Sequence, residues 1–214
     1  MKIMIPLVIA SVIAVSPKIL VEKPGLVTTL DDDGGRVELY APSHAARTLE
    51  YHGGAVVNQP LVELLFVGTW EKSRTDLLRR GVDHLSTTDA FQSTHERGVK
   101  ATALPITTRS LAGREKMNDL DVQLMIDRAI ENGSLPSRND DTIYVLFLSP
   151  AISSTLGEKT AGTDYASYHS HFHSHDVNVR YVVVPFHEDV NVMNQAASAS
   201  LIRAIINPDG DGWY

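Results

Sequence analysis

Cysteine is absent from this chain of 214 residues. Its absence excludes disulfide bonds, thiolate metal sites and a cysteine nucleophile. Clusters of lysine and arginine are missing as well, and the net charge is −7. Nucleic-acid phosphates are neutralised by such clusters, so we expect no nucleic-acid partner. No Gly-x-Ser-x-Gly motif follows an expected strand, which removes the usual pattern of a serine hydrolase.

Apolar runs long enough for a membrane-spanning helix, which needs roughly 20 residues, are also lacking, so no transmembrane segment is expected. A shorter run lies at the N-terminus, where Lys2 precedes a charge-free stretch from Ile3 to Val15. A basic start followed by a short apolar run is typical of a secretory signal peptide. We therefore expect residues 1–15 to be a signal peptide and the protein to be secreted or extracellular, with the periplasm as the bacterial equivalent. The alternative is a buried N-terminal strand.

The sequence does contain hydrophobic patterns typical of strands and of helices. Near-continuous apolar runs predict strands at 61–70, 99–107, 142–149 and 179–184, and residues 36–40 alternate like a short strand. Apolar residues at helical spacing predict helices at 71–85, 118–133 and 194–206, and Asn118 can cap the second. Residues 151–166 form a polar connection.

This order of elements predicts the fold class. Helices alternate with strands, then two strands follow without a helix between them, and a helix closes the chain. The pattern favours an α/β fold, a layered mixed sheet with flanking helices and one antiparallel edge strand. We expect one α/β domain at residues 51–214, preceded by an N-terminal arm at residues 16–50.

Histidine is concentrated in one place, where His169, His171, His173 and His175 alternate along the chain. An extended backbone puts alternate residues on one face, roughly 6.5–7 Å apart, so two imidazoles could share a metal ion. His187, beyond the apolar strand, is a further candidate ligand. Zinc is the cofactor that such a site would suit. The alternative is a polar, solvent-facing arm whose histidines bind no physiological metal.

Several short segments, taken in order, resemble the phosphate-induced-protein (EXORDIUM-like) family. They are Tyr51-His52-Gly53-Gly54 with Gly68-Thr69-Trp70, then Tyr168-His169-Ser170-His171-Phe172, then Ala197-Ser198-Ala199-Ser200-Leu201-Ile202 with Asn207-Pro208-Asp209-Gly210-Asp211-Gly212-Trp213-Tyr214. The resemblance implies an exported protein, in plants linked to the cell wall and growth, with no agreed biochemical activity. This chain departs from the plant members in having no cysteine.

The resemblance also implies a zincin-like fold, because bacterial members of the family look like metallohydrolases in the last helix. There a His-Glu pair precedes a leucine, and in this sequence the pair falls on Ala199 and Ser200. Neither can bind zinc or act as the base that activates a zinc-bound water. The resemblance thus implies a non-catalytic protein that binds a surface or cell-wall component. The alternative is a metal-dependent hydrolase that uses the histidines of residues 169–175 instead.

Overall fold

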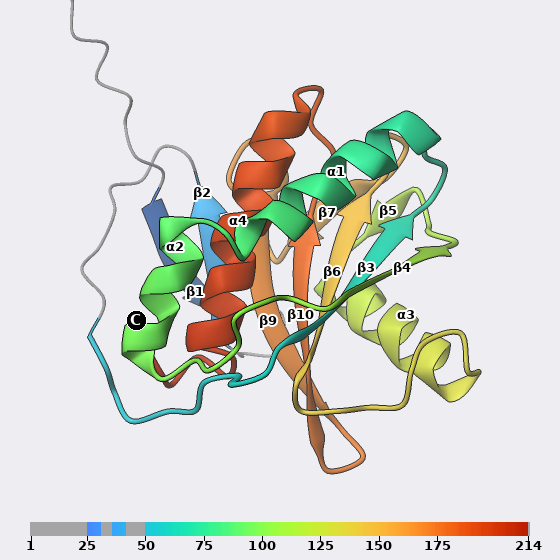
Figure 1. Ribbon diagram of the computed structural model, residues 1–214. Coiled ribbons are helices and arrows are strands. Elements are labelled where there is room, and N and C mark those ends of the chain that lie inside the picture. Colours follow the sequence, from blue (N-terminus) through green and yellow to red (C-terminus); the bar gives the residue numbers. More distant parts are fainter. Residues whose placement is uncertain (1–24, 31–35, 42–49, 214) are drawn as a thin grey trace, which may run out of the picture.

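A computed structural model describes residues 25–30, 36–41 and 50–213 (Figure 1). The expected signal peptide, residues 1–15, lies outside the described residues. Within them, no helix combines the length and the apolar character needed to cross a membrane. The described chain forms a mixed sheet with helices on both faces, which confirms the predicted α/β class (Figure 1).

The main sheet has seven strands in the order β1-β2-β9-β10-β6-β3-β4. Their bounds are Gly25–Leu30 (β1), Arg36–Ala41 (β2), Leu61–Val67 (β3), Ile106–Leu111 (β4), Thr142–Leu148 (β6), Ser167–Ser174 (β9) and Val177–Val184 (β10). Four neighbours, β10, β6, β3 and β4, run parallel. On the other side of β10 the strands β9, β2 and β1 are each antiparallel to their neighbour.

The antiparallel part is therefore larger than the single edge strand that the sequence predicts. β9 is antiparallel to β10 but is not an edge, because β2 pairs with its other side and β1 pairs with β2. Both of these strands lie in the expected N-terminal arm, so the sheet includes residues before position 51. The strand expected at residues 36–40 is confirmed as β2.

Two helix layers cover the sheet (Figure 1). Helices α1 (Lys72–Leu85) and α4 (Val190–Ile206) lie over one face, and α3 (Asp119–Glu131) covers the other. Every residue of β6 is buried, and its side chains alternate between the two apolar layers. Fully burying one such aliphatic or aromatic side chain contributes about 1.5–3 kcal/mol, so β6 anchors both layers.

Smaller elements complete the chain: α2 (Asp89–Gln92), the 3-10 helix η1 (Ser93–Arg97), and a second sheet of β5 (Lys116–Met117), β7 (Ser153–Leu156) and β8 (Lys159–Thr160). The polar connection expected at residues 151–166 thus contains two short strands.

Helix α3 begins where its sequence predicts. The Asn118 side chain accepts a hydrogen bond from the Asp121 N–H at 2.9 Å, and the Asp121 carboxylate accepts one from the Asn118 N–H at 3.2 Å. This reciprocal capping satisfies two backbone donors at the helix start. Helix α4 begins earlier than the expected residue 194, because the Asp189 side chain caps it by accepting from the Asn191 N–H at 2.8 Å.

The strand expected at residues 99–107 is wrong in its bounds, because only its last two residues belong to a strand. Val99, Ala101 and Leu104 are buried as their periodicity indicates, but they lie in a loop. The Ala101 N–H donates to the Asn58 carbonyl at 3.1 Å, so this loop is held by another loop rather than by a strand. The strand itself is β4, which begins only at Ile106.

Candidate functional site

The histidines of β9 follow the predicted alternation only in part. His169, His171 and His173 lie in the extended strand, opposite Val182, Arg180 and Asn178 of β10. His175 lies beyond the end of β9, in a turn where its φ is 49°. That left-handed backbone takes its side chain out of the row.

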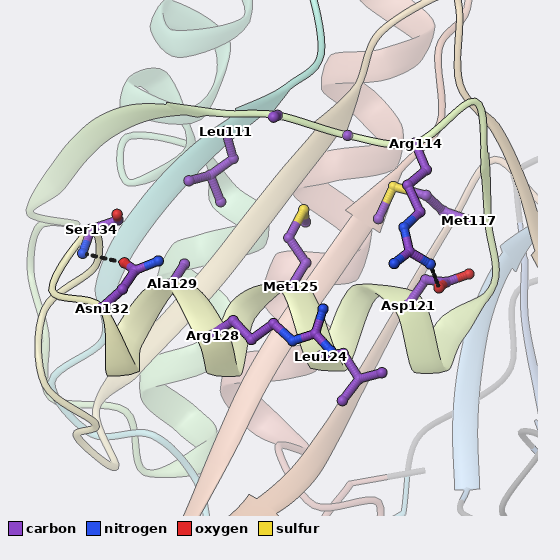
Figure 2. Close-up of a pocket in the computed structure, with 12 residues that line it drawn as sticks. Leu111, Arg114, Met117, Asp121, Leu124, Met125, Arg128, Ala129, Asn132 and Ser134 are labelled. Carbon is purple, nitrogen blue, oxygen red and sulfur yellow. Dashed lines mark hydrogen bonds and ion pairs between the residues drawn. The ribbon is translucent and has the colours of Figure 1, made fainter.

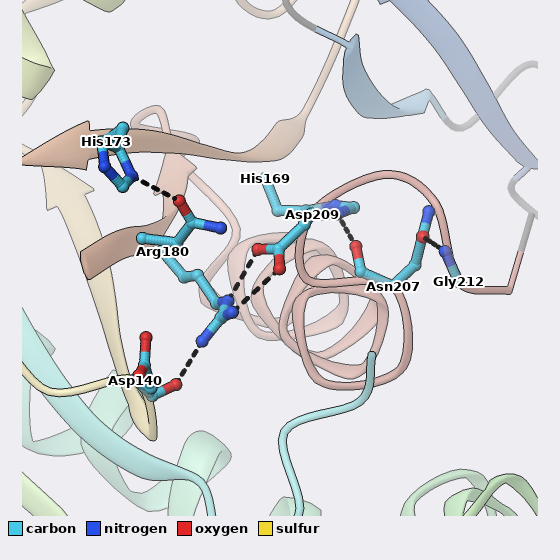
Figure 3. Close-up of polar contacts among 8 residues, drawn as sticks. Asp140, His169, His173, Arg180, Asn207, Asp209 and Gly212 are labelled. Atoms are coloured by element: carbon cyan, nitrogen blue, oxygen red, sulfur yellow. Dashed lines mark hydrogen bonds and ion pairs between the residues drawn. The ribbon is translucent and has the colours of Figure 1, made fainter. Parts of the chain in front are cut away.

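Each histidine has its own surroundings. His169 is buried, and its Nε2 donates to the Asn207 carbonyl at 3.1 Å (Figure 3). The exposed His173 hydrogen-bonds through Nδ1 to the Asn178 side chain at 3.1 Å. His187 lies past the opposite end of β10, where its Nδ1 accepts from the Asp189 N–H at 3.0 Å.

The five expected ligands are thus spread from the hairpin turn to the far end of β10. Among the described residues, no three histidine, aspartate or glutamate side chains gather where they could hold one metal ion. The structure does not bring the candidate zinc ligands His169, His171, His173, His175 and His187 together.

An ion pair between the buried Arg180 and the partly buried Asp209 lies beside β9 (Figure 3). The Arg180 guanidinium donates to both carboxylate oxygens of Asp209, each at 2.9 Å, and also to the Asp140 carbonyl. Burial raises the pKa of Asp209, but the hydrogen bonds and charge of Arg180 outweigh it, so the pKa lies below its ordinary value. The nearby His171 lowers it further. This arrangement, the C-terminal clamp, attaches the loop after α4 to the sheet.

The loop after α4 makes a second set of contacts. The Asn207 side chain accepts from the Gly212 N–H at 2.7 Å. Trp213 pairs with Tyr51 as an isolated antiparallel bridge, and their rings lie 5.1 Å apart. Two of the segments that carry the EXORDIUM-like resemblance are therefore in direct contact, through residues 51–54 and 207–213.

The resemblance places a His-Glu pair at Ala199 and Ser200 of α4, and of these two residues Ser200 contacts β9. Ser200 is fully buried, and its Oγ is 2.8 Å from the Oγ of Ser167 on β9. The Ser167 hydroxyl donates to the Ala196 carbonyl at 2.9 Å. Because Ser167 has only one proton to give, Ser200 is the donor between the two hydroxyls. Ala199 packs against the apolar core.

A crevice opens at the carboxyl ends of β3, β6 and β10. In open α/β sheets, ligands bind outside these ends, where neighbouring strands send their connections to opposite faces. β3 leads into α1 on one face, whereas β6 leads toward β7 on the α3 face. The crevice has a volume of about 230 Å³ and is lined by Thr69, Trp70, Glu71, Arg74, Pro150, Phe186 and Glu188.

Arg74 fixes one wall of this crevice. Its Nη2 donates to the carbonyls of His187 and Glu188, the latter at 2.9 Å. Its guanidinium lies 4.6 Å from the centre of the Phe186 ring, a cation–π contact. The ring centres of Trp70 and Phe186 are 6.1 Å apart. The Trp70 indole N–H donates a hydrogen bond to the Val67 carbonyl at 3.1 Å. The two aromatic rings are therefore held in place before any ligand arrives.

The carboxylates of the crevice are accessible. Glu71 and Glu188 are both exposed, next to the partly buried Trp70 and Phe186. Aromatic rings can pack against the C–H groups of a ligand, and accessible carboxylates beside them can accept hydrogen bonds from its hydroxyls. Trp70 belongs to one of the segments that carry the family resemblance, but no local pattern in the sequence indicates a binding role for it.

A second buried polar group lies under α3, and sequence reasoning missed it. The Tyr181 hydroxyl donates to the buried Asp119 carboxylate at 2.7 Å, and Gln123 donates to the same carboxylate at 2.9 Å. Burial, followed by the charge of Asp119, raises the pKa of Tyr181 well above its ordinary value, so the phenol stays a donor. Burial likewise raises the pKa of Tyr165 to about 12.

Comparison of the chain with protein-family models, with curated proteins and with solved structures finds no match. The EXORDIUM-like resemblance and its zincin-like fold therefore stay predictions from sequence motifs.

Proposed function

We propose that this chain is an exported, EXORDIUM-like protein that binds a cell-wall or other extracellular surface component without catalysing its hydrolysis. The buried contact between Ser200 of α4 and Ser167 of β9 carries the proposal. A zincin-type hydrolase needs a zinc ligand and a carboxylate base facing an open, water-containing site. Here Ser200 is fully buried and donates a hydrogen bond to Ser167, and the partly buried Ala199 packs against the core.

The alternative, a metal-dependent hydrolase built on residues 169–175, has less support. A zinc site needs several ligands within about 2.0–2.2 Å of one ion. His169 is buried against the Asn207 carbonyl, and His175 has left the strand.

The crevice at the carboxyl ends of the strands is the proposed binding site, and its chemistry suits a polyhydroxylated ligand such as a cell-wall sugar. Trp70 and Phe186 offer apolar surface to sugar C–H groups, while Glu71 and Glu188 can accept hydrogen bonds from hydroxyls. The anchored Arg74 keeps Phe186 and the segment after β10 in position.

Two experiments test the proposal. For the non-catalytic part, pure protein is incubated with polysaccharide and protein substrates, with and without added zinc, and we expect no turnover. Metal-dependent turnover would contradict it, and loss of that turnover in a His169→Ala, His171→Ala double variant would favour the alternative hydrolase.

For the binding part, soluble cell-wall oligosaccharides are titrated into the protein by calorimetry. Glu188→Gln should weaken binding roughly tenfold, because a hydrogen bond to a charged group contributes about 1.5–3 kcal/mol and 1.4 kcal/mol is a factor of ten. Asp83→Asn, an equal charge change on the exposed surface of α1, is the control and should bind normally. Equal affinities for Glu188→Gln and the unchanged protein would remove the crevice as the site.

A further inference from the structure

A small pocket lies beside the first turns of α4 and shares the side chain of Phe186 with the crevice. Its volume is about 130 Å³. Three segments contribute to its lining: residues 162–166 before β9, residues 185–187 after β10, and residues 192–196 of α4. This pocket, called the α4 pocket below, has no part in the proposed sugar site.

The wall before β9 is held in place by hydrogen bonds. The Gly162 N–H donates to the Tyr165 carbonyl and the Ala166 N–H donates to the Tyr40 carbonyl, both at 2.8 Å. The hydroxyl oxygens of Tyr165 and Ser154 are 2.9 Å apart, which fixes the Tyr165 ring as well. The pocket is therefore formed before a ligand arrives, so little ordering opposes binding.

The lining of the α4 pocket is uncharged. Among the described residues that form it, none is a lysine, arginine, aspartate or glutamate. Tyr165, Pro185 and Met193 are buried, whereas the polar Thr163 and His187 are exposed and so lie toward solvent. An ion in this pocket would lose its hydration without gaining a partner of opposite charge, so a neutral ligand is favoured.

A larger cavity, between the loop after β4 and α3, differs in this respect (Figure 2). Its volume is about 250 Å³, and Arg114, Asp121 and Arg128 contribute to its lining together with Met117 and Met125. Arg114 and Asp121 form an ion pair at 3.1 Å (Figure 2). Because charges of both signs line this cavity, it favours no single class of ligand.

The size and the side chains of the α4 pocket suit one aromatic ring. Protein cavities of about 150 Å³ hold a benzene molecule, which is close to the volume available here. The rings of Tyr165 and Phe186 can pair with a ligand ring, and the thioether of Met193 also contacts aromatic rings favourably. A saturated group of the same size would fill the pocket without these contacts.

His187 adds a hydrogen-bond donor to the α4 pocket. Its Nδ1 accepts from the Asp189 N–H at 3.0 Å, so the neutral imidazole carries its proton on Nε2. This N–H can donate to an oxygen of a ligand. A carbonyl group attached to the ligand ring supplies such an oxygen without adding a charge.

We propose that the α4 pocket binds a neutral aromatic carbonyl compound. The ring of the ligand lies among Tyr165, Phe186 and Met193, and its carbonyl oxygen accepts a hydrogen bond from His187. The ligand class differs from that of the crevice, so this site does not depend on the sugar site.

Methyl benzoate is the probe. It is titrated into the full chain labelled with ¹³C at the methionine methyl groups, and binding is followed by NMR. We expect a dissociation constant on the order of 1 mM, as for other ligands of this size, and a ring-current shift of the Met193 methyl signal. Met117 and Met125 of the larger cavity are internal references that should not shift. No shift at Met193, or a larger one at Met125, would overturn the proposal.

Two analogues test the chemistry of the ligand. Methyl cyclohexanecarboxylate has a similar size but no aromatic ring, and it should bind roughly fivefold more weakly than methyl benzoate. Benzoate carries a charge for which the lining offers no partner, and it should bind at least roughly tenfold more weakly. If the first analogue matched methyl benzoate, the pocket would not select an aromatic ring; if benzoate did, it would not select a neutral ligand.

Variants that leave the shared Phe186 unchanged locate the site. His187→Asn keeps an acceptor for the Asp189 N–H but removes the Nε2 donor, and it should weaken binding of methyl benzoate roughly fivefold. His173→Asn, the same exchange at an exposed histidine of β9, is the control and should leave the affinity unchanged. Equal affinities for the two variants would reject the contact between His187 and the carbonyl oxygen.

Val192→Phe fills the α4 pocket and should abolish binding. A Val192→Phe protein that is folded by circular dichroism yet binds methyl benzoate normally would reject the site. If that variant fails to fold, Thr163→Trp, at an exposed position of the lining, replaces it. Undiminished binding to the folded Thr163→Trp protein would have the same meaning.

Discussion

Asp209→Asn is the sharpest perturbation of the C-terminal clamp. The substitution keeps the size of the side chain but removes the charge that faces Arg180. The Arg180 side chain is only 8% exposed, and its two hydrogen bonds to Asp209 are both 2.9 Å long. The variant leaves a buried guanidinium with the Asp140 carbonyl and a neutral amide as its remaining acceptors.

The expected loss of stability follows from this burial. Removing one partner of a buried ion pair costs about 3–5 kcal/mol, because the other charge is left uncompensated. The amide oxygen of the asparagine can still accept one of the two hydrogen bonds, so we expect about 3 kcal/mol, the lower end of that range. For an m-value of about 1–3 kcal/mol/M, the urea midpoint should fall by about 1–3 M.

The pH dependence gives an independent signature. The folded-state pKa of Asp209 is below its ordinary value, so its ionisation contributes stability above the unfolded pKa. That contribution is lost as the pH falls through the lower, folded-state pKa. The difference in unfolding free energy between the unchanged protein and Asp209→Asn should therefore be constant near neutral pH and shrink below about pH 4.

Urea unfolding followed by tryptophan fluorescence measures both effects, since Trp213 lies in the clamped loop. Asp83→Asn is the matched control, because its ion pair with Arg79 is exposed and should contribute no more than about 0.5 kcal/mol. Replacing both partners, as Arg180→Met with Asp209→Leu, should cost less than Asp209→Asn alone, because no buried charge is left. If Asp209→Asn lowers the free energy of unfolding no more than the control does, the ion pair with Arg180 does not hold the loop.

Substitutions at two further positions test buried polar groups. Ser200→Glu should destabilise the protein by at least about 3 kcal/mol, because a carboxylate would be buried without a cation, whereas Ser200→Ala should destabilise it by only about 1 kcal/mol. Thermal unfolding compares the two variants. A normally stable Ser200→Glu protein would show that the contact with Ser167 is open to solvent. Tyr181→Phe removes a donor from the buried Asp119 and should cost about 1.5–3 kcal/mol in urea unfolding. A loss under about 0.5 kcal/mol would mean that the Asp119 carboxylate does not depend on the phenol.

The sequence predicts best those elements whose local signals agree. β6 is a continuous apolar run and proves to be buried throughout, and α3 has both its buried stripe and the Asn118 cap. β4 lacks such a signal, because an edge strand with exposed Thr107, Thr108 and Ser110 has no apolar alternation. The buried loop before it carries the alternation instead, which places the predicted strand too early.

The candidate sites depend on contacts between distant segments, which local patterns do not contain. Alternation correctly puts His169, His171 and His173 on one face, but it cannot show that the chain turns at His175. Nor could it reveal that Arg180, inside an apolar strand, meets a carboxylate 29 residues later. A charged residue in a strand that is otherwise buried is the one signal that could have indicated the clamp.

The strand order has a consequence for how the chain is made. β10, which joins the parallel and antiparallel parts of the sheet, comes late in the sequence, and β2 pairs with β9 although some 130 residues separate their partners Glu38 and His169. β1 and β2 can pair with each other early, but the other edge of β2 must wait for nearly the last strands of the chain. Such non-local pairing is slow, so the antiparallel part of the sheet is completed only when synthesis is almost finished.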